Sequence, residues 1–171
     1  MSDTRHAYLP TSIGDLLVVA SGDALVGLYF PRHWYPPEAS AIGELVDAAN
    51  DVVFTEVARQ LDEYLAGNRT SFDLRAETSG TPFQEQVWAL LRDIPFGETT
   101  TYGELARTLG NANLAQLVGQ AVGHNPISIV IPCHRVVGAS GKLTGFAGGL
   151  ERKQLLLELE EPEEAAASRL F

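Results

Sequence analysis

"TYGELARTLGNANLAQLVGQAVGHNPISIVIPCHRV", residues 101–136, contains two short helical patterns followed by an apolar run. Residues 101–110 predict one helix and residues 114–123 a second, with Gly110 ending the first. Two short helices on a turn of three or four residues form the helix-turn-helix pattern, whose second helix lies on DNA. A plain helical hairpin has the same spacing, so both interpretations stay open here. The apolar residues 127–132 predict a buried strand that ends at Cys133.

The amino-terminal half has the signals of a small α/β unit. Two β-rich runs within residues 14–30 flank the turn residues 21–23 and predict a hairpin. Three prolines within residues 31–40 then interrupt regular structure. Residues 51–68 predict a helix that ends at Gly67-Asn68. Its expected apolar stripe is Val53, Val57, Leu61 and Leu65.

The carboxyl-terminal half is predicted to be mostly helical. Thr81 as a cap and Pro82 at the first helical position open a helix that extends to about residue 94. Its expected buried residues are Phe83, Val87, Leu90 and Leu91. A glycine-rich loop over 138–149 leads to a final amphipathic helix over 150–160. We therefore expect an α/β domain over 1–75, a linker over 76–80 and a second domain over 81–171, whose tail frays from about residue 162.

Composition indicates a folded protein without a membrane span. Of the 171 residues, 45% are hydrophobic and 20% are charged, and no apolar run approaches the length that a bilayer requires. A single cysteine excludes an internal disulfide, and four scattered histidines do not have the spacing of a metal site. We expect a cytoplasmic protein that needs no metal or other cofactor. The formal charge is −10, but residues 82–160 carry six basic and seven acidic side chains, so this half can still contact DNA weakly.

Cys133 is the candidate nucleophile. A lone cysteine is often only a small buried hydrophobe. Here His134 and Arg135 follow it directly and favour the thiolate. A thiol needs a base to take its proton and a third group to orient that base. His134 is the candidate base, and Glu160 on the last helix is a candidate orienting group, although a helix-end carboxylate is also commonly solvated.

Five blocks of sequence together resemble one known family. "TTYGELA", "GHNP", "IPCHRVV", "GASGKLTGFAGGL" and "LLLELE" occur in the order and at the spacing found in the O6-alkylguanine-DNA alkyltransferases, over about residues 80–160. The resemblance implies an α/β amino-terminal domain and a helical, winged-helix-like carboxyl-terminal domain with a helix-turn-helix. It implies a monomeric protein, with duplex DNA that contains O6-alkylguanine as its partner. The damaged base is flipped out and its alkyl group is moved irreversibly to the protein's own thiol.

The resemblance also implies roles for individual residues. Cys133 accepts the alkyl group, His134 takes the thiol proton through a water, and Glu160 holds His134. Tyr102 donates a proton to N3 of the leaving guanine, and Asn125 ties the helix pair to the cysteine segment. Substrate contacts are implied for the carbonyls of Cys133 and Val136, the amide of Ala147, the ring of Phe146 and the space beside Gly148.

The DNA-binding face departs from the family pattern. The second helix of the family carries an arginine that enters the duplex, and the matching residue here is Gln116. No Lys or Arg occurs between Arg107 and Arg135. We expect Ala115, Gln116 and Gly119 to face the minor groove and Arg135 to contact DNA, with Lys142 and Arg152 as further candidates for phosphate contacts. Duplex binding should therefore be weaker than is usual in the family.

Four other functions fit parts of the sequence. Alkyltransferase-like proteins bind lesions without repairing them, but they have another residue in place of the cysteine. An acceptor that acts on a free alkylated base or another small alkyl donor would keep the thiol and need little affinity for DNA. A thiol hydrolase using Cys133, His134 and Glu160 would turn over repeatedly. A purely structural helix-turn-helix adaptor leaves the cysteine block without a purpose.

Overall fold

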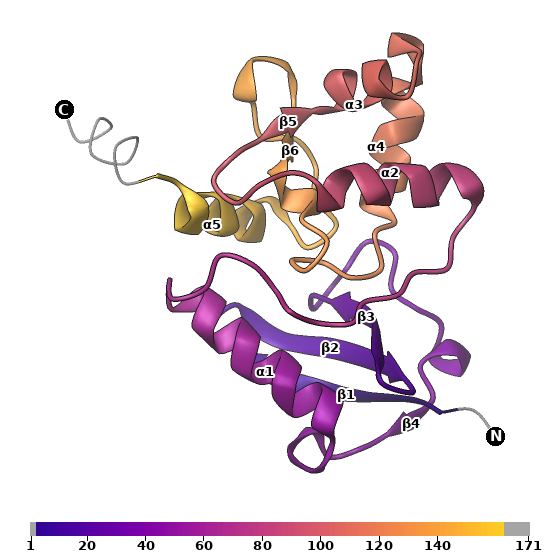
Figure 1. Ribbon diagram of the computed structural model, residues 1–171, viewed down its shortest axis with the longest axis vertical. Helices are drawn as coiled ribbons and strands as arrows, with labels where there is room; N and C mark the ends of the chain where they lie inside the picture. The colour runs from indigo at the N-terminus through magenta and orange to yellow at the C-terminus, as the bar shows by residue number, and fades with distance from the viewer. Residues whose placement is uncertain (1–2, 163–171) are drawn as a thin grey trace. The chain divides into compact units, whose positions relative to one another are not determined.

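The computed structural model describes residues 3–162 and separates the chain into two units (Figure 1). Unit 1 comprises Met1–Ser79 with Pro126–Val130, and unit 2 comprises Gly80–Asn125 with Ile131–Phe171. Among the described residues, no helix is both long and apolar enough to span a bilayer. The expected fraying of the tail concerns residues 163–171, which lie outside the described part of the chain.

Within the described residues, unit 1 is built on a four-stranded sheet in the order β3-β2-β1-β4. The strands are β1 (Thr4–Thr11), β2 (Gly14–Ser21), β3 (Ala24–Tyr29) and β4 (Glu44–Leu45). β2 is antiparallel to β1 and β3, and β4 is parallel to β1. The hairpin predicted over 14–30 is confirmed, and Gly22 takes the positive φ of 60° that its tight turn requires. β1 was not predicted, because its polar residues and Pro10 hide the alternation of buried Ala7 and Leu9.

Helix α1 (Val52–Leu65) lies along one face of the sheet (Figure 1). It begins where Asp51 accepts hydrogen bonds from the amides of residues 53 and 54. The predicted apolar stripe was only half right, because Val53 and Leu65 are half-buried. A spacing of four drifts around a helix of 3.6 residues per turn. The buried face alternates steps of three and four, with Phe54, Val57, Leu61 and Tyr64 as its apolar members.

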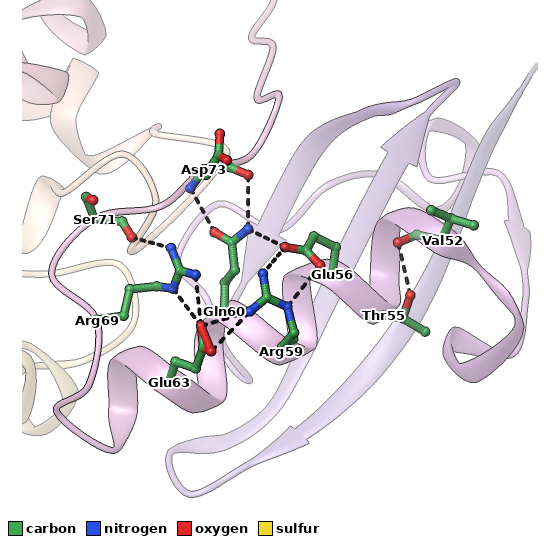
Figure 2. Close-up of polar contacts among 9 residues, drawn as sticks. All are labelled: Val52, Thr55, Glu56, Arg59, Gln60, Glu63, Arg69, Ser71 and Asp73. Carbon is green, nitrogen blue, oxygen red and sulfur yellow. Dashed lines mark hydrogen bonds and ion pairs between the residues drawn. The ribbon is translucent and has the colours of Figure 1, made fainter.

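A polar network fastens the segment after α1 back onto the helix (Figure 2). The buried side chain of Gln60 donates to the carbonyl of Asp73 at 3.0 Å and accepts from its amide at 2.8 Å. Arg69 pairs with Glu63 at 2.8 Å, and Glu63 also pairs with Arg59. Beyond this network, the Glu77 amide donates to the Leu25 carbonyl at 3.0 Å, so part of the expected linker lies beside β3.

Residues 126–130 also belong to unit 1. The Leu28 amide donates to the Pro126 carbonyl at 2.8 Å, and the Ser128 amide donates to the Leu28 carbonyl at 3.1 Å. The strand predicted over 127–132 is wrong, although the run is buried as expected. Ile129 has a φ of +72°, and the Val130 amide donates back to Ser128 at 2.8 Å, so the chain turns here. A β-branched residue rarely adopts this conformation, and the apolar composition does not reveal it.

Unit 2 contains the predicted helices. Its α-helices are α2 (Pro82–Arg92), α3 (Tyr102–Thr108), α4 (Ala115–Gly123) and α5 (Leu150–Glu160). Thr81 caps α2 as predicted, and of the four residues expected on its core face Val87 and Leu91 are buried. Trp88 of α2 is buried as well, and it donates its indole N–H to the Ala121 carbonyl of α4 at 2.8 Å. The connection between α3 and α4 includes the 3-10 helix η3 (Ala112–Leu114).

Short elements hold the cysteine segment in unit 2. Strand β5 (Thr100–Thr101) pairs in parallel with β6 (Val136–Val137). Between Pro132 and β6 lies the 3-10 helix η4 (Cys133–Arg135). A further 3-10 turn, η5 (Ala139–Gly141), opens the glycine-rich loop. Cys133 is therefore the first residue of a tight helical turn that follows a proline, and not the last residue of a strand.

Candidate active site

The η4 turn buries the cysteine and both residues that follow it. Cys133 is 4% exposed and donates its amide to the Ile131 carbonyl at 2.8 Å. Adjacent side chains of a strand point to opposite faces. A 3-10 turn has three residues per turn, so successive side chains point about 120° apart. Here all three lie in the interior of the unit, because His134 and Arg135 are buried as well. The thiol, the imidazole and the guanidinium thus come from three consecutive residues.

Glu160, the last residue of α5, binds both cationic-capable side chains. Its Oε2 lies 2.8 Å from His134 Nε2 and 2.9 Å from Arg135 Nη2, and its Oε1 accepts from Arg135 Nε at 2.7 Å. Glu160 is 2% exposed and His134 is fully buried. Two parallel bonds from a guanidinium hold a carboxylate in one orientation. The structure therefore brings Glu160 to His134 as predicted and adds Arg135 as a second partner.

The imidazole of His134 is neutral and has one nitrogen without a partner among the described residues. Burial lowers the pKa of His134, and this effect outweighs the opposing influence of Glu160. Since a carboxylate only accepts, His134 Nε2 carries the proton that it donates to Glu160. Nδ1 then holds the lone pair, and it has no hydrogen-bond partner within residues 3–162. The imidazole can accept a proton at Nδ1, and the Glu160 carboxylate beside Nε2 would stabilise the resulting positive charge.

The position of Arg135 differs from the one predicted. We expected it to contact DNA, but its side chain is buried and fully engaged within unit 2. Besides its two bonds to Glu160, it donates from Nη1 to the Ile94 carbonyl at 2.6 Å and lies over the ring of Phe96. The side chain is only 9% exposed, so little of this guanidinium is available to a phosphate. Its physical role is to hold the Glu160 carboxylate that orients His134.

Tyr102 lies near the thiol as a protonated phenol. It is the first residue of α3, and Thr144 Oγ1 donates to its hydroxyl at 3.1 Å. Burial raises the pKa of Tyr102, and the charge of Cys133 raises it further. A Cβ added to Gly119 of α4 would lie 3.7 Å from the Tyr102 ring. Because its oxygen already accepts from Thr144, the phenol has its own proton free to donate.

The remaining predicted substrate residues lie on two segments of unit 2. Phe146, Ala147 and Gly148 are buried in the loop before α5, and the carbonyl of Gly148 accepts from Arg152 Nη1 at 3.0 Å. Val136 begins β6, and its amide donates to the Cys133 carbonyl. Asn125 donates from Nδ2 to the Ile131 carbonyl at 2.8 Å and thereby ties the end of α4 to the cysteine segment.

The predicted DNA-facing residues lie on α4. Gln116 is exposed, Ala115 and Gly119 are half-buried, and Lys142 is exposed on the glycine-rich loop. The opposite face of α4 buries Val118, Ala121 and Val122. The exposed residues of this helix, Gln116, Leu117 and Gln120, are therefore uncharged, and one of them is apolar.

Comparisons with known proteins agree across both units. Residues 82–162 match the family model described as the 6-O-methylguanine DNA methyltransferase DNA binding domain, and residues 4–78 match its ribonuclease-like domain. A methylated-DNA–protein-cysteine methyltransferase from Mycolicibacterium paratuberculosis is 45% identical over 98% of both chains. The chain belongs to this family.

Solved structures of the methyltransferase family have the same fold. A crystal structure of Mycobacterium tuberculosis OGT in complex with DNA has a TM-score of 0.82 at 42% identity and covers 92% of both chains. A 6-O-methylguanine DNA methyltransferase from Methanococcus jannaschii has a TM-score of 0.62 at 26% identity. The predicted family and the α/β fold class are thus confirmed, and the likeness extends beyond residues 80–160 to the amino-terminal unit.

One buried charge of this methyltransferase was missed by the sequence reasoning. Lys153 of α5 is fully buried, and its Nζ donates to the Thr144 carbonyl at 3.3 Å. Burial lowers its pKa to about 8, while the charge of Cys133 opposes that shift. Lys153, Leu156 and Glu160 form the buried face of α5. The signal that could have revealed this buried charge was the presence of two ionisable residues, Lys153 and Glu160, on the same helical stripe as Leu156. The buried face of the predicted amphipathic helix is therefore partly charged.

Replacing Lys153 with methionine should stabilise the protein near pH 7. An unfolded lysine holds its proton up to about pH 10.5, so a folded pKa of about 8 means that protonated Lys153 opposes folding. This opposition is at most about 3 kcal/mol. The parent should gain stability relative to Lys153→Met as the pH rises from about 8 to 10.5. Urea unfolding of both proteins across this range measures the difference, and a pH-independent difference would contradict the prediction.

Proposed function

We propose that this protein repairs O6-alkylguanine in duplex DNA by moving the alkyl group to Cys133 in a single turnover. The observation that carries the proposal is a buried thiol next to a neutral His134, which a buried Glu160 orients. These residues lie in the unit that matches a 6-O-methylguanine DNA methyltransferase model. A thiolate is the softest anionic nucleophile that a protein offers, and it suits displacement at an alkyl carbon.

The proposed step begins with proton transfer from the thiol to His134. A water carries the Cys133 proton to Nδ1, the free nitrogen of the ring, and Glu160 stabilises the resulting imidazolium. The sulfur then forms a bond to the alkyl carbon while the bond from that carbon to O6 breaks. The electron pair of the broken bond stays on the guanine. Lys153 places positive charge near the sulfur and thereby favours its anionic form.

Tyr102 has the properties required of the acid for the leaving base. Its raised pKa keeps the phenol protonated, and its oxygen accepts from Thr144 without losing its own proton. Donation to N3 of guanine lets the base leave as a neutral molecule. The guanine would lie between the loop of residues 146–148 and the cysteine segment, with the Ala147 amide donating to O6. The carbonyls of Val136 and Cys133 would accept from the exocyclic amine.

Single turnover follows from the stability of the product. The thioether on Cys133 has a C–S bond that no group in the site can break, and the chain has no other cysteine to accept a second alkyl group. Each protein molecule then repairs one lesion. A thiol that must stay reduced until it reacts suits a reducing compartment, and we propose the cytoplasm as the location.

The proposal includes a lower affinity for duplex DNA than is usual in the family. Ala115, Gln116 and Gly119 would lie in the minor groove, where Gln116 can hydrogen-bond to the base left without a partner but brings no charge. This exposed, uncharged helix face also supports a second candidate function, in which Cys133 accepts alkyl groups from free bases or other small donors. Reaction rates with O6-methylguanine in duplex DNA and as the free base distinguish these two functions.

Replacing Gln116 with arginine is expected to tighten duplex binding about tenfold at low salt. The new guanidinium adds one cation near the phosphates and should steepen the salt dependence by about one counterion. Fluorescence anisotropy with a labelled duplex at several salt concentrations measures both changes. Gln154→Arg, on the exposed side of α5, is the control for added charge. Equal or weaker binding by Gln116→Arg at fixed salt would refute the assignment.

Mass spectrometry of the intact chain tests the proposed function. After incubation with O6-benzylguanine, and separately with duplex DNA containing O6-methylguanine, the protein should gain one alkyl group and no more. Several product molecules per protein would indicate a hydrolase. Release of the lesion without any gain in mass would indicate a pure binder.

A further inference from the structure

The outer face of the sheet in unit 1 carries a row of apolar side chains that the alkyl-transfer chemistry does not use. Tyr8 of β1, Leu17 of β2 and Tyr29 of β3 are paired directly across the three strands. Their sequence neighbours Ala7, Leu16 and Leu28 are fully buried. Side chains alternate between the two faces of a strand, so the row lies on the face opposite the core. The solvent face of an antiparallel sheet is usually polar, yet Tyr8 is 54% exposed here.

The loop that follows β3 turns this row into a hollow. Pro31, Pro36 and Pro37 of the loop line a space of about 480 Å³ together with the two tyrosines. The same loop exposes Trp34 by 56% and Tyr35 by 46%. Exposed aromatic side chains gathered around a concavity mark binding surfaces, and tyrosine, tryptophan and arginine dominate the energetics of protein interfaces.

The floor of the hollow is held in place before any ligand arrives. A Cβ on Gly27 would come 2.7 Å from Tyr29 Cε2, so the ring lies against the backbone at this glycine. The buried ring of His33 meets Tyr29 edge to face at 5.3 Å and accepts the Phe30 amide proton at Nδ1. Burial lowers the pKa of His33 to about 4, so this ring is neutral. A preformed surface loses little conformational freedom on binding.

Charge distinguishes the possible partners. Asp15 lines the hollow, and its carboxylate has no hydrogen bond or ion pair within the described residues 3–162. Residues 1–81 contain twelve acidic and five basic side chains. This field repels nucleic acid and attracts a cationic partner. Arg32, the one cation among the residues that line the hollow in the described part of the chain, is exposed and can bind a carbonyl oxygen.

We propose that this hollow binds a basic, proline-rich segment of a partner protein in the polyproline II conformation. Such segments dock in grooves lined by aromatic rings, because their pyrrolidine rings pack on aromatic faces and their extended backbone loses little entropy. The rings of Tyr8 and Tyr29 provide the packing surface, and Asp15 pairs with an arginine or lysine of the ligand. The interaction is independent of the chemistry at Cys133 and would bring the repair protein to a partner.

Calorimetry with the full chain and synthetic decapeptides tests the proposal. The probe contains prolines, leucines and two arginines; one control peptide has alanine for every proline, and another has glutamate for both arginines. We expect the probe to bind with a Kd of about 10–500 µM and each control to bind at least about tenfold more weakly. Tyr8→Ser should weaken binding about tenfold. Asp15→Asn should reduce the preference for arginine over glutamate about fivefold.

Val52→Ser is the matched control, because Val52 is an 84% exposed apolar side chain at the start of α1. It should leave peptide binding unchanged, and circular dichroism confirms that each variant is folded. The proposal is overturned if the probe does not bind or if the glutamate peptide binds equally well. Self-association, or binding of single-stranded DNA or tetramethylammonium, would indicate another occupant of the hollow if the Tyr8→Ser change abolished it. Any of these results would also overturn the proposal. Transfer of the benzyl group to Cys133 should be unaffected in Tyr8→Ser, so failure of the proposed function is detected separately.

Discussion

Changing Cys133 to alanine is expected to abolish alkyl uptake completely. The parent should gain the mass of one benzyl group from O6-benzylguanine, while Cys133→Ala should gain none, because no other thiol exists in the chain. Loss of a sulfur that is only 4% exposed leaves a small cavity and should cost about 1 kcal/mol of stability. The variant therefore stays folded, and loss of uptake reports on chemistry.

Duplex binding separates recognition from reaction in the same variant. Cys133→Ala should retain its affinity for DNA containing O6-methylguanine, since the residues of α4 are unchanged. Its fold can be compared with that of the parent by circular dichroism and urea unfolding. Persistent alkyl uptake by the folded variant would show that another side chain is the acceptor, and the proposed function would have to be withdrawn.

Glu160→Gln should have the second largest effect, and it should act on both rate and stability. The amide no longer stabilises an imidazolium at His134, and we expect alkyl transfer to slow about 10²- to 10⁴-fold. Arg135 would at the same time become a buried cation without its carboxylate, which costs about 3–5 kcal/mol. Single-turnover kinetics with O6-benzylguanine and urea unfolding measure the two consequences.

A double variant separates these consequences. Arg135→Met combined with Glu160→Gln removes the unpaired cation, so stability should recover while the slow rate persists. Glu158→Gln, two residues before the end of α5 and exposed, is the matched control that should change neither property. If the double variant regained the parental rate, Glu160 would have only a structural role and His134 would act without it.

Acid should also destabilise the protein, because it protonates His134. Its folded pKa lies below 6.5, so the unfolded chain binds the proton more tightly. The stability contributed by the neutral, buried ring is present above about pH 6.5 and is lost as the pH falls below that value. We therefore expect unit 2 to lose stability in acid as this proposed base becomes protonated.

Much of the site could be predicted from local sequence. The "PCHR" block, the Asn-Pro before it and the final helix identified Cys133, His134 and Glu160 as candidates, and the structure brings the last two to hydrogen-bond distance. Caps and turns placed α2 and the β2–β3 hairpin, because Thr81, Pro82 and Gly22 act through their own backbone and a few neighbours. Signals of this kind do not depend on the rest of the fold.

Only the tertiary structure decided how distant segments use these residues. Arg135 was expected on DNA but binds Glu160 and the Ile94 carbonyl, partners 25 and 41 residues away. Lys153 became a buried charge near the thiol because α5 packs against the cysteine turn, and Tyr8 joined an aromatic row through strand pairing.

Residue types and their short spacing were enough to predict the family, the candidate nucleophile and most helices. The turn at Ile129, the direction of Arg135 and the burial of Lys153 depend on which segments meet in space. Long-range packing sets which segments meet, and the local backbone preferences of the residues do not encode those contacts.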